Sequence, residues 1–217
     1  TSLLLLYFAV AASAAILIRL ALHPPRELFR KLLHLISLGS IIVLLTAFTD
    51  WRAAAGAPLL LAAALYPVLS WLEKRCGYAE LLTERKCGEI KRSLLCFFLM
   101  AGILIALLWG GFGNWGKAVV TMATMAWGFG DAAAALVGKA FGCRPIRHRL
   151  VEGAKTIEGT TAMLLVSLLA IFVTACISGA ASWPVALLVA VLTAPICAGV
   201  ELVSRGGSDT VTVPFSA

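Results

Sequence analysis

The sequence predicts an all-α, polytopic integral membrane protein with about seven transmembrane helices. Of its 217 residues, 61% are hydrophobic and only 13% are charged, and the mean hydropathy is +0.96. A soluble domain of this size carries about 25% charged residues, so this chain lacks the polar surface that a soluble fold needs. The composition also excludes a disordered chain, a collagen and a secreted disulfide scaffold.

The helices are predicted from runs of about 20 mostly apolar residues, the length that crosses a bilayer. These runs cover residues 1–18, 32–49, 53–72, 93–116, 118–138 and 159–200. Asp131 interrupts the fifth run. The last run has 42 residues, about 63 Å as a helix at ~1.5 Å per residue, so it must fold back. The turn-forming residues 178–184, with Trp183 suited to an interface, mark that turn and give seven helices.

The basic residues predict how these helices are oriented. Fifteen of the 18 Lys and Arg lie in the first, third and fifth loops and in the tail. The positive-inside bias places those segments and the C-terminus in the cytoplasm and the N-terminus outside. We expect one transmembrane domain over residues 1–217, trimmed at one or both ends, in a prokaryotic cell membrane rather than an organelle membrane.

Asp131 is the most informative ionisable residue, because an unpaired carboxylate inside a membrane costs several kcal/mol. It follows Gly128 and Gly130, which loosen the helix and allow a ligand or another backbone to approach. Such a carboxylate binds a cation, moves a proton or pairs with a base. A purely structural ion pair is the alternative.

Three further clusters lie at the predicted cytoplasmic boundary. Arg30, Lys31 and His34 share one helical face, which indicates a phosphate-facing cluster or, for the first two, ordinary positive-inside flanking. Lys155 is followed by a helix start at which Thr156 or Gly159-Thr160 serves as a cap and leaves N–H groups for an anion.

In this segment, Glu158 is a metal ligand, a partner for Lys155 or part of a capping box. In the tail, Glu201 ends the last span, and Asp209 follows a Gly-Gly-Ser sequence and is a ligand or a turn former. A membrane carboxylate near Arg, Lys, His and Glu side chains is suited to a magnesium-bound polyphosphate beside a lipid. Phosphoryl transfer needs that combination of charge, metal and acceptor hydroxyl.

Four separated motifs resemble the dolichol kinase family, which includes phytol kinases and CTP-dependent diacylglycerol kinases. They are Arg30–His34, the sequence from Gly128 to Gly142, Lys155–Thr160, and Glu201 to Asp209 with the Val-Thr-Val-Pro that ends at Pro214. They occur in the family's order and on one membrane side, from the second helix to the tail. Members commonly continue past the tail into a further helix.

The resemblance implies a CTP-dependent, Mg²⁺-requiring kinase of a membrane lipid alcohol such as a polyprenol, an isoprenoid alcohol or diacylglycerol. It implies Asp131 and Lys155 as catalytic residues, and Asp131, Glu158 and Asp209 as metal ligands. The implied nucleotide-binding residues are Arg30, Lys31, His34, Gly130, Gly138, Lys155, Thr156, Glu158, Gly159 and Thr160. The bilayer and the nucleotide are the expected partners, with no nucleic acid.

Two positions depart from the family pattern. Thr210 replaces the Asn that often follows the tail Asp, and Ala135 replaces a second acidic residue that phytol-kinase-like members often carry, which argues against that subgroup. One alternative function is a phosphatidate cytidylyltransferase, although its His-Gly-Gly and Asp-Arg-x-Asp motifs are absent from the sequence. Another is a transporter that uses Asp131 as a proton or cation site.

Overall fold

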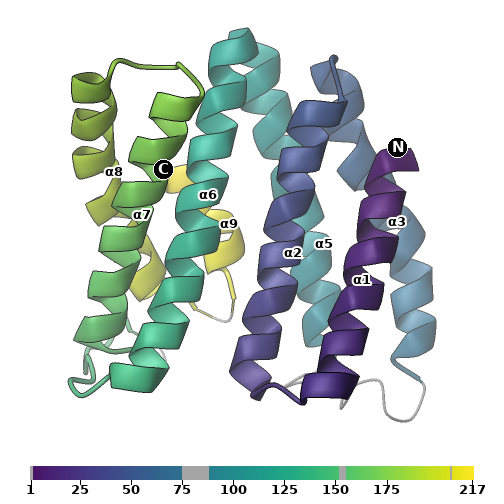
Figure 1. Ribbon diagram of the computed structural model, residues 1–217, viewed down its shortest axis with the longest axis horizontal. Coiled ribbons are helices and arrows are strands. Elements are labelled where there is room, and N and C mark those ends of the chain that lie inside the picture. Colours follow the sequence, from purple (N-terminus) through teal and green to yellow (C-terminus); the bar gives the residue numbers. More distant parts are fainter. Residues whose placement is uncertain (1, 75–87, 152–154, 206) are drawn as a thin grey trace. The chain divides into compact units, whose positions relative to one another are not determined.

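The computed structural model describes residues 2–74, 88–151, 155–205 and 207–217, and within them it contains helices and no strand (Figure 1). The helices are α1 (Ser2–Leu22), α2 (Arg26–Ala47), α3 (Trp51–Leu72), α5 (Glu89–Leu104), the π-helix η1 (Ile105–Trp109), α6 (Gly110–Phe141), α7 (Ile157–Ile177), α8 (Trp183–Val203) and α9 (Asp209–Ser216). The predicted all-α fold class is therefore confirmed.

Six helical segments of the described residues are long and apolar enough to cross a membrane. One of them, Glu89–Phe141, has 53 residues, which is about 80 Å at ~1.5 Å per residue and more than twice a hydrocarbon core. The backbone leaves the helical region inside this segment at Gly113, where φ is 59° and ψ is −139°. Glycine tolerates such a positive φ without a steric penalty. The expected break near Lys117 therefore lies a few residues earlier.

Helix boundaries differ from the prediction where charged residues continue a helix. The second helix begins at Arg26, directly after Pro25, rather than at the start of the charge-free run. Likewise, α6 continues through Lys139 to Phe141. Charge ends a hydrophobic run but does not end a helix, because Arg and Lys are good helix formers.

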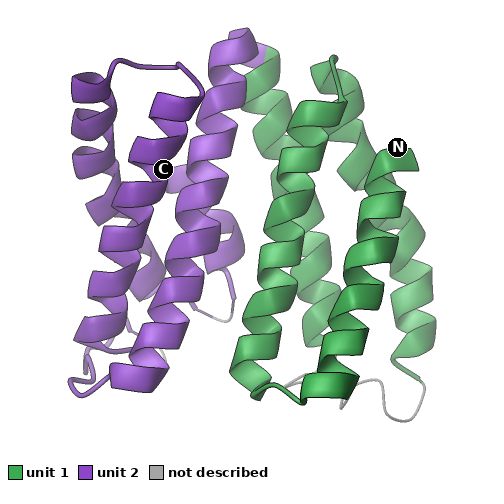
Figure 2. Cartoon of the chain, viewed as in Figure 1, with its two compact units in different colours: residues 1–110 green, residues 111–217 purple. Residues whose placement is uncertain are grey.

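The chain divides into two compact units, Thr1–Gly110 and Gly111–Ala217 (Figure 2). In the first unit, α1 packs on α2, and α3 packs on α5 and η1. The Tyr7 hydroxyl donates to the Ile36 carbonyl at 2.6 Å and links α1 to α2. A Cβ on Gly102 of α5 would lie 3.1 Å from the Ala55 carbonyl of α3, so glycine allows these two helices to approach closely.

In the second unit, α7 and α8 form a hairpin joined at the predicted turn, where Gly179 has a φ of 64°. Each helix buries a stripe with a spacing of about four residues. The buried stripe of α7 is Gly159, Met163, Ser167, Ile171 and Ala175. The buried stripe of α8 is mostly small: Ala186, Ala190, Ala194, Cys197 and Ala198, followed by Glu201. Small residues at such spacing allow close helix packing within a membrane.

Candidate active site

Asp131 lies on α6 and is 9% exposed. It stands ten residues before the end of the helix at Phe141, about 15 Å at ~1.5 Å per residue. Thr124, Trp127 and Gly128 of the same helix are also buried. The sequence placed Asp131 seven residues from the helix end, so the carboxylate lies one turn deeper along its helix than expected.

Gly130, the residue before Asp131, faces α7. A Cβ on Gly130 would collide with the Ser167 hydroxyl and the Met163 sulfur. The Ser167 hydroxyl donates to the Ala126 carbonyl at 3.0 Å, so a buried polar bond holds α7 against the turn of α6 that precedes Asp131. Gly130 therefore serves close helix packing, and its assignment to nucleotide binding stays a prediction.

Helices α6 and α7 also approach each other closely near the C-terminal end of α6 and the start of α7. A Cβ on Gly159 would lie 2.9 Å from the Ala134 carbonyl and 3.3 Å from the Gly138 Cα. Thr156 occupies the space beside Gly138, with 3.2 Å between its hydroxyl oxygen and a Gly138 Cβ position. Gly138 and Gly159 thus bring the start of α7 into contact with α6, seven residues beyond Asp131.

Thr156 caps α7, which settles the choice between the two predicted caps. Its hydroxyl accepts the Gly159 N–H at 3.1 Å, while Thr160 donates to the Thr156 carbonyl and Ile157 donates to the Arg144 carbonyl, both at 3.0 Å. The Thr160 bond is the ordinary i→i−4 bond of the first helical turn. The expectation that this helix start leaves its N–H groups free for an anion is wrong for Ile157 and Gly159, whose acceptors are the Arg144 carbonyl and the Thr156 hydroxyl.

Lys155 contacts the end of α8. Its ammonium lies 2.9 Å from the Glu201 Oε1, donates to the Glu201 carbonyl and lies 3.5 Å from the Ser204 carbonyl. Glu201 is 8% exposed. The partner of Lys155 is therefore Glu201 and not Glu158, because the fold brings the end of α8 beside the loop.

Glu158 instead faces the loop that precedes α7, where its Oε2 accepts the Arg144 N–H at 3.3 Å. The neighbouring Ile146 N–H donates to the Lys155 carbonyl at 2.8 Å. A short bridge between Pro145 and Thr156 completes this connection. These bonds fix the backbone from the Lys155 carbonyl to Thr156.

The predicted metal ligands do not form a cluster in the described part of the chain, which holds no group of three or more His, Cys, Asp and Glu side chains placed to share a metal. Glu158 lies in the first turn of α7, next to Gly159, which packs on Gly138. Gly138 is about 10 Å along α6 from Asp131 at ~1.5 Å per residue. Asp209 is the first residue of α9, which packs on α8. Mg²⁺ uses one or two protein carboxylates together with substrate phosphates, so a three-ligand cluster is not required, and the assignment of Asp131, Glu158 and Asp209 as metal ligands stays a prediction.

Arg30, Lys31 and His34 are half-buried on α2, in the first unit. The Arg30 guanidinium lies 2.9 Å from Glu89 Oε1 of α5 and 3.3 Å from Glu27 Oε2 of its own helix. Sequence reasoning missed both acids. The spacing of three residues could have identified Glu27, whereas Glu89 is distant in the sequence and gave no local signal.

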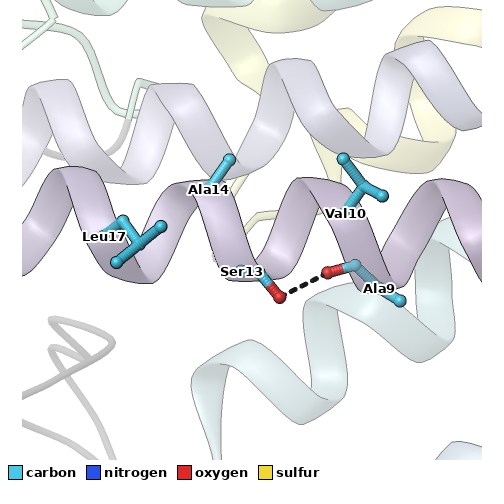
Figure 3. A pocket seen from close by; sticks show the side chains of 5 residues that line it. All are labelled: Ala9, Val10, Ser13, Ala14 and Leu17. Carbon is cyan, nitrogen blue, oxygen red and sulfur yellow. Dashed lines mark hydrogen bonds between the residues drawn. The ribbon is translucent and has the colours of Figure 1, made fainter.

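A hollow on the surface of α1 lies apart from the predicted residues (Figure 3). It is lined by Ala9, Val10, Ser13, Ala14 and Leu17, and the Ser13 hydroxyl donates to the Ala9 carbonyl of its own helix at 2.7 Å. The lining is almost wholly apolar and holds no charged group. The hollow therefore lacks the charged side chains that phosphate chemistry needs.

The predicted site residues fall into two groups by unit. Asp131, Gly138 and the segment 155–160 belong to the second unit together with Glu201 and Asp209, whereas Arg30, Lys31 and His34 belong to the first. Within the second unit, the structure joins Gly138, Thr156 and Gly159 by packing and Lys155 to Glu201 by an ion pair.

Comparison with known proteins identifies a relative. No family model matches the chain, and no solved structure matches it. The chain is 32% identical over 213 residues to the phytol kinase of Synechocystis sp., a match that covers 96% of the chain and 84% of the relative. The relative bears the name of the subgroup that Ala135 argues against, and the subgroup of this chain stays a prediction. With this identity and coverage, the chain belongs to the phytol and polyprenol kinase family.

Proposed function

We propose that the protein is a CTP-dependent kinase that transfers the γ-phosphate to the hydroxyl of a membrane lipid alcohol. The observation that carries this proposal is the buried carboxylate of Asp131 in a chain of this family. An apolar alcohol reaches its kinase through the bilayer, which gives a reason for placing the acidic group on a membrane helix. Polyprenols, isoprenoid alcohols and diacylglycerol share this chemistry.

In the proposed reaction, the alcohol oxygen attacks the γ-phosphorus while the bond from that phosphorus to the β-bridging oxygen breaks and CDP leaves. The hydroxyl proton is lost in the same step. Asp131 has two possible roles, as the acceptor of that proton or as a ligand of Mg²⁺. Bound Mg²⁺ supplies charge neutralisation at the phosphates. In this proposal Gly128 keeps the approach to Asp131 free of a side chain, whereas Gly130 is packed against α7.

Side chains hold the phosphates in this proposal. The Ile157 and Gly159 N–H groups at the start of α7 already have protein acceptors, so the proposal assigns the positive charge around the phosphates to Lys155, Arg30 and Lys31. The Arg30 guanidinium has five N–H donors, and in this proposal those not used by Glu27 and Glu89 bind a phosphate. The meeting of this first-unit cluster with Asp131 and Lys155 is part of the proposal, as is a contribution of His34.

The proposal includes the topology of seven crossings, with the N-terminus outside and the site at the cytoplasmic face of a prokaryotic cell membrane. In the second unit, the basic loop before α7 and the end of α8 lie at one end of the bundle, because Lys155 contacts Glu201 and the Arg205 guanidinium donates to the Arg149 carbonyl. In the first unit, the Arg30–Glu89 and Lys91–Glu73 pairs join the helix ends that border loops one and three. In each unit, the described helix ends that border the basic loops therefore lie at one end, which supports the orientation expected from the positive-inside bias.

The decisive experiment follows labelled nucleotide into lipid. Purified protein in lipid nanodiscs is given Mg²⁺, CTP or ATP labelled at the α- or γ-phosphate, and a panel of phytol, polyprenol, dolichol and diacylglycerol. We expect γ-label from CTP on one class of alcohol and no α-label on lipid.

Two results of this experiment contradict the proposal. Transfer of α-label to lipid indicates a cytidylyltransferase. An absence of transfer, together with nucleotide-independent ion flux in liposomes, indicates a transporter.

A further inference from the structure

We propose that Glu201 is a positioning residue, which holds the Lys155 ammonium in place for the phosphates of the nucleotide. This inference rests on the proposed kinase function. Glu201 contributes two acceptors, its Oε1 at 2.9 Å and its carbonyl oxygen, and the Ser204 carbonyl is a third at 3.5 Å. All three belong to the C-terminal end of α8.

The Lys155 ammonium and the Glu201 carboxylate stabilise each other. Glu201 is 8% exposed at the end of an otherwise apolar helix, and a negative charge near a helix C-terminus is unfavourable because the helix dipole is negative there. Lys155 supplies a positive charge at this end and adds a charged donor to the Glu201 carbonyl, which also accepts the Ser204 N–H at 3.1 Å. The pair therefore fixes the lysine side chain.

The hydrogen bonds of Lys155 differ in strength, and this difference makes the side chain suitable for a phosphate. An ammonium has three N–H donors. Two are held by Glu201 at short range, while the third reaches the Ser204 carbonyl only at 3.5 Å, at the limit of hydrogen bonding. A phosphate oxygen can take this third donor without loss of either contact to Glu201.

The backbone of Lys155 is held as well. Its carbonyl accepts the Ile146 N–H at 2.8 Å, and the next residue, Thr156, caps α7. A lysine fixed at both backbone and side chain loses little conformational entropy when a ligand binds. Glu201 thus strengthens nucleotide binding through Lys155 without contacting the nucleotide.

A purely structural ion pair is the competing explanation, and the chain offers a matched control for it. Lys91 and Glu73 in the first unit lie 2.6 Å apart, with side chains 22% and 13% exposed. The Lys155 and Glu201 side chains are 23% and 11% exposed. Glu73 is not among the residues assigned to the proposed site, so Glu73→Gln removes a comparable ion pair without changing a residue that the proposal uses.

The test measures steady-state phosphate transfer by wild type, Glu201→Gln, Lys155→Gln, the double variant and Glu73→Gln, with an unfolding midpoint for each. We expect Glu201→Gln to raise the KM for the nucleotide about tenfold or more, the usual loss for a charge-assisted hydrogen bond. The KM for the lipid should change less than about twofold, because Glu201 affects the binding of the nucleotide phosphates through Lys155 and not the binding of the lipid. Glu73→Gln should leave both KM values unchanged.

The double variant tests whether Glu201 acts through Lys155. Its nucleotide KM should equal that of Lys155→Gln, because two residues that act through one interaction are not additive. Multiplicative effects, or an unchanged nucleotide KM in Glu201→Gln, overturn the inference while the kinase function stands. If Glu201→Gln does not fold, Glu201→Asp, which keeps the charge and shortens its reach, takes its place under the same criteria. A wild-type chain without transfer overturns the proposed function and this inference with it.

Discussion

Lys155 and Thr156 are neighbours in the sequence, yet each is held by a different part of the fold. Thr156 makes a local contact, a cap on the Gly159 N–H three residues ahead, and the sequence predicts it because Thr at a helix start is a known pattern. Lys155 contacts Glu201, 46 residues away. A contact of that range depends on how α8 ends beside the loop, so the sequence alone could not reveal it.

The cap gives a prediction for a single side chain. Thr156→Ala removes the acceptor of the Gly159 N–H and should lower the free energy of unfolding by about 1 kcal/mol, whereas Thr156→Ser keeps the hydroxyl and most of the stability. Thermal or denaturant unfolding in detergent measures both variants. An alanine variant as stable as wild type would show that the cap contributes nothing.

At the scale of helices, the close approach of α6 and α7 depends on glycine. A Cβ on Gly159 would lie 2.9 Å from the Ala134 carbonyl, a distance that the backbone of α6 must relieve by moving. We expect Gly159→Ala to destabilise the protein by about 1–3 kcal/mol, the usual cost of overpacking. Phosphate transfer should fall as well, because Lys155 and Thr156 are attached to the same helix start.

Gly199 on α8 provides the control for this substitution. A Cβ there would meet no atom within 4 Å, so Gly199→Ala should keep or raise stability by up to about 1 kcal/mol through helix propensity. The comparison is made by unfolding midpoints of both variants under one condition. Equal effects of the two substitutions would refute the role assigned to the α6–α7 contact.

The sequence predicted that the helices exist, but it predicted their first and last residues less well. Apolar runs of membrane-spanning length identified the helices, and the turn at 178–184 was correctly predicted from its Gly, Ser and Pro residues. The start of α2 at Arg26 and the end of α6 at Phe141 were missed, because the charge-free runs stop before the helices do. The backbone departure at Gly113 gave no signal that distinguished it from the neighbouring glycines.

At the scale of the whole chain, the proposed topology predicts which thiols face outward. Cys143 lies in the basic loop before α7, and Ser182 precedes α8 at the opposite end of the hairpin. In a variant whose other cysteines are replaced by serine, a membrane-impermeant maleimide should label Ser182→Cys on intact cells. Cys143 should react only after permeabilisation. The reverse pattern would invert the proposed orientation.

The sequence indicated which residues belong to the candidate site, but not which side chains they contact. Asp131, Lys155 and Thr156 were identified from their unusual positions in an apolar chain. The roles of Glu201 and Glu89 as partners of basic residues follow only from packing between helices distant in the sequence. Membrane helices place few constraints on such pairings, since nearly all of their surface is apolar.

The measurement that tests the central claim most directly is phosphate transfer by Asp131→Asn. The matched control is Asp50→Asn, because Asp50 caps α3 by accepting the Arg52 N–H at 3.1 Å and asparagine caps equally well. Both variants are compared with wild type after equal insertion and folding have been verified. We predict that Asp131→Asn loses at least about 100-fold in turnover while Asp50→Asn keeps wild-type turnover, and near-wild-type transfer by Asp131→Asn would contradict the account.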